Sequence, residues 1–102
     1  MKKLTMVVHA SLQQELADCL RGMPQLDTFM FSHVEEHSSQ LEHDPFLSAR
    51  DKVVGYVPQV RVDALIQDKD IDDVMQVLRV SKCSFKGKGI YWITNVPEAG
   101  EL

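Results

Sequence analysis

The chain has 102 residues, a formal net charge of −4, and 25% charged and 44% hydrophobic residues. This length fits one domain, and we predict a single domain over residues 1–102. The charges are of mixed sign, which argues against a nucleic-acid partner, because phosphate contacts need a concentrated basic face. No apolar run approaches the roughly 20 residues of a membrane span, so we expect no direct membrane insertion.

The two cysteines, Cys19 and Cys83, lie far apart in the sequence. They form no C-x-x-C pair, and two free thiols are typical of a reducing compartment. The apolar run Leu4–Val8, which follows Lys2 and Lys3, is too short for the core of a signal peptide. We therefore expect a cytoplasmic protein.

The N-terminal part of the chain predicts a strand, a helix and a second strand. Leu4–Val8 is a short β-prone run, and Ser11 is the expected N-cap of the helix. The helix is indicated by apolar residues at helical spacing, namely Leu12, Leu16, Cys19 and Leu20. Gly22 ends it, and Leu26–Val34 returns to strand character.

The middle and C-terminal parts predict a long loop and a second β-α-β unit. Glu35–Arg50 is polar and without periodicity, and loops of this length are usually functional or disordered. Val53–Ile66 is strand-like, with Pro58 indicating an edge position or a bend. The next helix is capped by Asp68 or Asp70, and its apolar face is Ile71, Val74, Met75 and Leu78.

The last expected strand is Ile90–Thr94. The full order predicts an α+β fold of the ferredoxin-like βαββαβ type. In that fold an antiparallel four-stranded sheet carries two helices on one face, here with a long loop between strands 2 and 3.

The segment Phe31–Asp44 contains three of the four histidines in the chain. We predict a transition-metal site made by His33, His37, His43 and Asp44, because imidazole binds Zn, Cu, Ni and Co and carboxylates can complete the shell. His33 and His37 can share an ion only across a turn or helix, since a strand would separate them by about 13 Å. A solvated acidic loop and a pH-sensitive partner contact are the alternatives.

A basic, glycine-bearing connection before the last strand is the second candidate site. Its lysines supply positive charge, and its glycines let backbone N–H groups approach an anion. The alternative is an ordinary connection whose glycines serve only the turn. The candidate anion- or nucleotide-binding residues are Lys82, Lys86, Gly87, Lys88 and Gly89.

Several segments resemble the PII signal-transduction proteins. Val53–Val62 resembles the strand that follows the long T-loop of that family, and Gln67–Val74 resembles its Asp-capped helix. Gly87–Ile93 resembles its Gly-x-Gly connection and the strand after it. The resemblance covers nearly the whole chain and implies a homotrimer with ligand clefts between subunits and a T-loop-like segment at about residues 35–50.

The resemblance implies a regulatory or sensor protein that binds a small ligand or metal ion and signals to a protein partner through the 35–50 loop. The implied cofactor is a transition metal or an adenine nucleotide. Two C-terminal arginines that grip phosphate in PII proteins have no counterpart in the acidic tail here. In this respect the chain resembles a divergent branch of PII-like proteins whose genes accompany heavy-metal efflux systems. This resemblance implies a membrane transport system as partner.

A metal-binding heavy-metal tolerance protein, with the trimer architecture of the CutA type, is the alternative function. We expect no enzyme activity, because the sequence has no Walker motif and no H-E-x-x-H motif. The adjacent Ser32 and His33 lack a third partner and an oxyanion hole in the sequence pattern.

Overall fold

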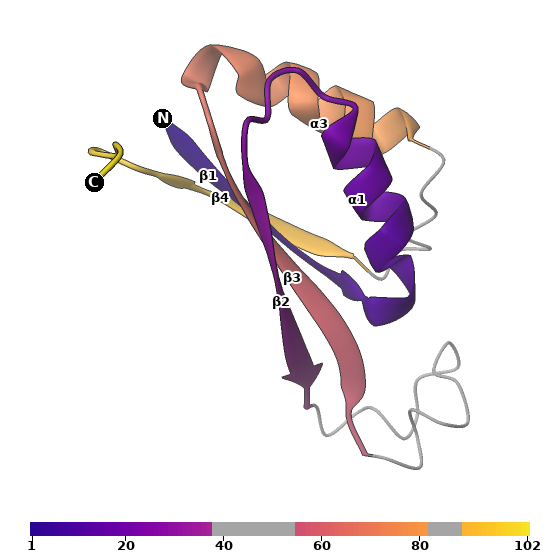
Figure 1. Cartoon of the computed structure of the whole chain (residues 1–102). Coiled ribbons are helices and arrows are strands. Elements are labelled where there is room, and N and C mark those ends of the chain that lie inside the picture. Colours follow the sequence, from indigo (N-terminus) through magenta and orange to yellow (C-terminus); the bar gives the residue numbers. More distant parts are fainter. Residues whose placement is uncertain (38–54, 82–88) are drawn as a thin grey trace.

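The computed structural model describes residues 1–37, 55–81 and 89–102. In this part of the chain, four strands form one antiparallel sheet in the order β2-β3-β1-β4, so that β1 and β3 are central (Figure 1). The strands are β1 (Lys2–His9), β2 (Phe29–Glu36), β3 (Val57–Ile66) and β4 (Ile90–Asn95).

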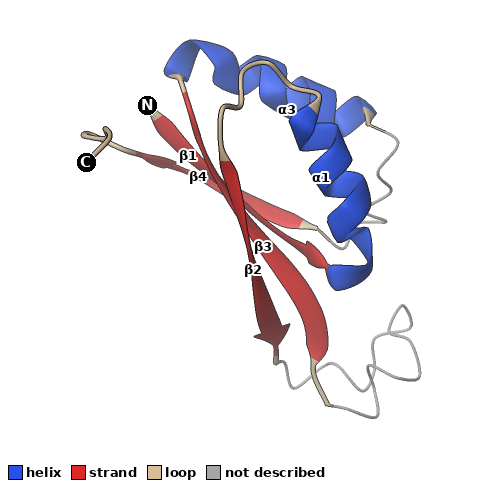
Figure 2. Cartoon of the chain, viewed as in Figure 1, coloured by secondary structure: helices blue, strands red, loops and turns tan. Residues whose placement is uncertain are grey.

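Two helices lie on the same face of this sheet (Figure 2). Each begins with a short 3₁₀ turn: η1 (Ala10–Leu12) leads into α1 (Gln13–Arg21), and η3 (Asp68–Asp70) leads into α3 (Ile71–Val80). The expected ferredoxin-like α+β fold is confirmed by this order of elements and strands. Neither helix, nor any other in the three described ranges, has the length and apolar character needed to cross a membrane.

The core lies between the helices and the two central strands. Directly opposed residues of an antiparallel pair point to the same side of the sheet. The pairs that face the helices are Leu4 with Ala64, Met6 with Val62, and Val8 with Val60. The helices add their apolar faces, formed by Leu16, Ala17, Leu20, Val74, Met75 and Leu78. The expected apolar face of the second helix is thereby confirmed.

The start of the first helix differs from the prediction. Ser11 is not the N-cap but lies inside η1, and His9 takes the capping position. The imidazole Nδ1 of His9 accepts a hydrogen bond from the backbone N–H of Ser11 at 3.1 Å and lies 2.9 Å from the Ser11 hydroxyl oxygen. The ring thus satisfies an N–H group at the helix start that has no partner within the helix.

The second strand begins and ends later than the predicted Leu26–Val34. Its pairing with β3 runs from Phe29 opposite Ala64 to Glu36 opposite Val57, so the strand includes two glutamates that were expected in the loop. Cross-strand hydrogen bonds determine where a strand ends, and an edge strand tolerates charged side chains. Most of the predicted loop Glu35–Arg50, namely residues 38–50, lies outside the described residues.

The third strand begins at Val57, and the predicted start at Val53 lies outside the described residues. Gly55 precedes the strand with a φ of 80°, a conformation that glycine adopts without steric cost. β1 pairs with β3 only as far as Gln59, so at Pro58 the strand has a neighbour on one side alone. The edge character predicted from this proline therefore holds locally, although β3 is a central strand.

Candidate functional site

The paired ends of β2 and β3 form the base of the segment that was predicted to be the loop. The Gln59 amide donates a hydrogen bond to the Glu36 carboxylate. Nε2 of His37 lies 3.0 Å from Oε1 of Glu35, and the His37 ring centroid is 5.6 Å from that of Tyr56. Side chains on both sides of the segment are therefore in contact, and we call this set of contacts the loop base.

The structure describes two histidines of the predicted metal site, His33 and His37. They could bind one ion only if a turn or helix lay between them, and none does. His33 lies within β2, and His37 directly follows its last residue, with no turn or helix between them. Four residues of strand span about 13 Å. His43 and Asp44 lie outside the described residues, and within the described ones no three His, Cys, Asp or Glu side chains are grouped to hold a metal ion. The predicted site therefore depends on His43 and Asp44.

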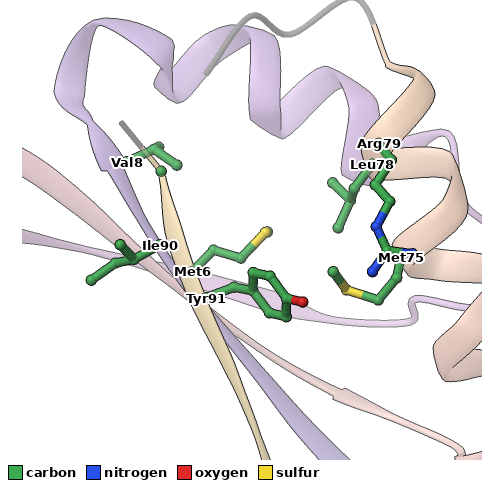
Figure 3. A pocket seen from close by; sticks show the side chains of 8 residues that line it. Met6, Val8, Met75, Leu78, Arg79, Ile90 and Tyr91 are labelled. Carbon is green, nitrogen blue, oxygen red and sulfur yellow. The ribbon is translucent and has the colours of Figure 1, made fainter. Parts of the chain in front are cut away.

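Of the predicted anion-binding residues, the structure describes only Gly89, while Lys82, Lys86, Gly87 and Lys88 lie outside the described residues. Gly89 borders a pocket of about 330 Å³ between α3 and the sheet (Figure 3). We call this pocket the α3–β4 pocket. The apolar side chains that line it are Met6, Val8, Met75, Leu78 and Ile90.

The α3–β4 pocket exists because the helices do not cover the edge strand β4. Tyr91 lies opposite Met6 and Ile93 lies opposite Leu4, so both side chains point toward the helix layer. Met6 and Leu4 are buried there, yet Tyr91 is 52% exposed and Ile93 is 39% exposed. The space that a covering side chain would fill is therefore open above β4.

Arg79 and Tyr91 are the polar side chains of the α3–β4 pocket that sequence reasoning did not identify. Met75 and Arg79 are four residues apart on α3 and so lie on one side of the helix. That spacing was visible in the sequence, as was the alternation that turns Tyr91 toward the helices. The sequence did not indicate that the two helices would leave β4 uncovered.

The opposite face of the sheet carries a polar network across three strands. Arg61 contacts Asp63 through Nε at 3.0 Å and Nη2 at 3.3 Å. The buried Thr5 hydroxyl donates a hydrogen bond to the Asp63 carboxylate at 2.7 Å. The Arg61 guanidinium also lies over the Trp92 ring, 5.7 Å from its centroid, at a distance typical of a cation–π contact. We call this set the Asp63 network.

The Asp63 network changes the acidity of its carboxyl group. Desolvation by burial raises the pKa of Asp63, but hydrogen bonds from Arg61 and Thr5 and the positive charges of Arg61 and Lys3 outweigh it, and the pKa lies below its ordinary value of 3.8. Each of these contacts is stronger to the ionised carboxylate than to the protonated acid. Asp63 therefore stabilises the folded chain in its charged form.

The sheet order and the single helix layer place the chain among the ferredoxin-like α+β proteins. A family model described as "Protein of unknown function (DUF3240)" matches residues 1–102, and the chain belongs to this family. A comparison with curated proteins found no match.

A solved structure of the same family shares the fold. The chain is similar to the crystal structure of a DUF3240 family protein from Shewanella baltica OS155, with a TM-score of 0.75 over 99% of this chain and 94% of that one. The two sequences are 14% identical, so the likeness supports the fold alone. The resemblance to PII proteins stays a prediction beside this family membership.

The Asp63 network predicts a specific acid sensitivity. Replacing Asp63 by Asn should lower the free energy of unfolding at pH 7 by about 1–2 kcal/mol, because charged hydrogen bonds are lost. Since the folded pKa is below the unfolded one, this contribution is complete above about pH 4 and is lost as the pH falls through the folded pKa. Urea unfolding of both chains at several pH values measures it.

The matched control is Asp27→Asn, which neutralises an exposed aspartate and should change stability by less than about 0.5 kcal/mol. A gap between wild type and Asp63→Asn that stays constant from pH 7 to pH 3 would contradict the assignment.

Proposed function

We propose that this chain is a PII-like regulatory sensor, which binds a small ligand or metal ion and presents the segment at about residues 35–50 to a protein partner. The loop base is the observation that carries the proposal. Contacts between Glu36 and Gln59 and between His37 and Tyr56 hold the two ends of the segment together. A ligand that binds one conformation of such a segment more tightly shifts its population and so changes the affinity for the partner.

The position of the α3–β4 pocket supports this coupling. β1 ends at His9, beside the start of β3, and β4 starts opposite Val7. β2 ends at Glu36, opposite Val57. The loop base and the Gly89 border of the pocket thus lie at the same end of the sheet. The pocket and the loop base lie toward opposite edges of the sheet, so ligand binding would act on the segment through the central strands β1 and β3.

The proposed ligands are a transition metal held by His43 and Asp44 together with either His33 or His37, and an adenine nucleotide whose phosphates contact Lys82, Lys86, Lys88 and the two glycines of that connection. The proposed partner is a membrane transport system on the cytoplasmic side. In this role the chain acts through binding and carries out no reaction of its own.

We also propose a homotrimer assembled through the helix-free face of the sheet. Apolar side chains on that face remain exposed in the single chain: Met30 is 65% exposed, Leu65 46% and Trp92 40%. Their cross-strand partners, Asp63, Lys3 and Thr5, place all three on this face. These apolar side chains lie on β2, β3 and β4 around the Asp63 network, which would lie beneath a second subunit.

Calorimetric titration of the metal-stripped chain tests the ligand proposal. Zn, Cu, Ni and Co are titrated in one series, and ATP and ADP in another. We expect micromolar binding in at least one series. Replacing His33, His37 and His43 by Ala should weaken metal binding at least tenfold, because imidazole ligands are removed. Replacing Lys86 and Lys88 by Ala should weaken nucleotide binding by a similar factor, because phosphate contacts are lost.

The matched controls are His9→Asn, which keeps a side-chain oxygen for the helix N-cap, and Lys69→Ala, which removes an exposed lysine of η3. Neither should change binding. Metal binding without nucleotide binding would favour the metal-tolerance function, and absence of both would refute the proposed ligands.

Sedimentation of the purified chain tests the assembly. We expect three times the mass of one chain for the wild type, and the mass of one chain for Met30→Glu and Trp92→Glu, because a buried carboxylate without a partner is strongly unfavourable. Val80→Glu, at a 69% exposed position of α3, should remain trimeric. A monomeric wild type, or an intact trimer in Met30→Glu, would contradict this interface.

A further inference from the structure

The α3–β4 pocket combines apolar walls with one cationic side chain. Figure 3 shows the Met6 and Met75 side chains facing each other across it, from β1 and from α3. The Arg79 side chain reaches from α3 along Met75, and the Tyr91 hydroxyl is turned toward the helix. A guanidinium and a phenol hydroxyl therefore face the same apolar space from its two sides.

The polar groups of this pocket are not used within the described part of the chain. Among residues 1–37, 55–81 and 89–102, the basic groups within 4 Å of a carboxylate belong to Met1, Arg21, His37 and Arg61, and Arg79 is not among them. No hydrogen bond of the Tyr91 hydroxyl occurs within these ranges either. An anion in the pocket could therefore accept hydrogen bonds from both the Arg79 guanidinium and the Tyr91 hydroxyl. It would displace no contact within the described part of the fold.

The size of the pocket limits the ligand. The pocket has a volume of about 330 Å³. Pockets for small molecules begin at about this volume and combine apolar walls with few polar groups that fix orientation. The ligand that fits has an apolar body of several carbons and one anionic end.

We propose that the α3–β4 pocket binds a small amphipathic monocarboxylate. Its apolar chain would lie between Met6 and Met75, and its carboxylate would be held by Arg79 and the Tyr91 hydroxyl. A guanidinium binds a carboxylate through two parallel N–H donors, and a phenol O–H donates a third hydrogen bond. This ligand is neither a metal ion nor a nucleotide, so the inference goes beyond the proposed function and uses none of its predicted ligand residues.

Octanoate is the probe, because it joins an apolar chain of several carbons to one carboxylate. Calorimetric titration is made below its micellar concentration, with octanamide as the uncharged compound of the same size. We expect submillimolar binding of octanoate and at least tenfold weaker binding of octanamide. Arg79→Gln should weaken octanoate binding about tenfold and leave octanamide binding unchanged, and Tyr91→Phe should weaken octanoate binding about threefold.

The matched control is Arg21→Gln, which removes an exposed arginine from the other helix and changes the net charge equally. It should bind octanoate as the wild type does. Circular dichroism of each variant verifies the fold, and both substitutions in the pocket are at exposed positions.

Three results would overturn the proposal: no binding of octanoate to the wild type at millimolar concentration, equal binding of octanoate and octanamide, or equal affinities of Arg79→Gln and Arg21→Gln. Displacement of octanoate by ATP, with ATP binding itself lost in Arg79→Gln, would assign the pocket to a nucleotide and also contradict it. Metal binding at the histidines is measured in a separate titration. A negative result for octanoate therefore does not affect the test of the proposed metal site.

Discussion

One layer of two helices covers a sheet of four strands, and the rest of the structure depends on this constraint. Alternation along β1 and β3 places Leu4, Met6, Val60 and Val62 under the helices, where they are almost fully buried. The edge strand β4 obtains no such cover, and every one of its residues is exposed in the single chain. Its apolar residues Ile90 to Ile93 would be unfavourable in water unless something binds them.

The two faces of β4 offer different chemistry. On the helix side, Tyr91 borders a pocket with apolar walls and a guanidinium at its edge, which suits a small amphipathic molecule. On the other side, Trp92 lies against Arg61 in a network that also includes Asp63. The loop base lies at the end of the sheet where β4 begins, but on the side of the opposite edge strand, β2.

Sequence periodicity predicted the fold well, because both helices have a clear apolar face and the strands alternate. It was wrong about Ser11, since a histidine ring at the end of the preceding strand can cap a helix as a serine can. It ended the second strand too early, because Glu35 and Glu36 look like loop residues although pairing with β3 extends to them. The α3–β4 pocket was harder to predict. Arg79 and Tyr91 come to line one pocket only through tertiary packing, and the exposure of β4 depends on the position of α3 on the sheet.

The central claim is that β4 is the binding strand, uncovered in one chain and covered in the functional assembly. Hydrogen–deuterium exchange of the amides of β4 and β3, measured from low to high protein concentration, tests it most directly. The account predicts slow exchange in β3 throughout, and exchange in β4 that is fast at low concentration and slows as the chains assemble. Exchange in β4 that is independent of concentration, whether fast or slow, would contradict it.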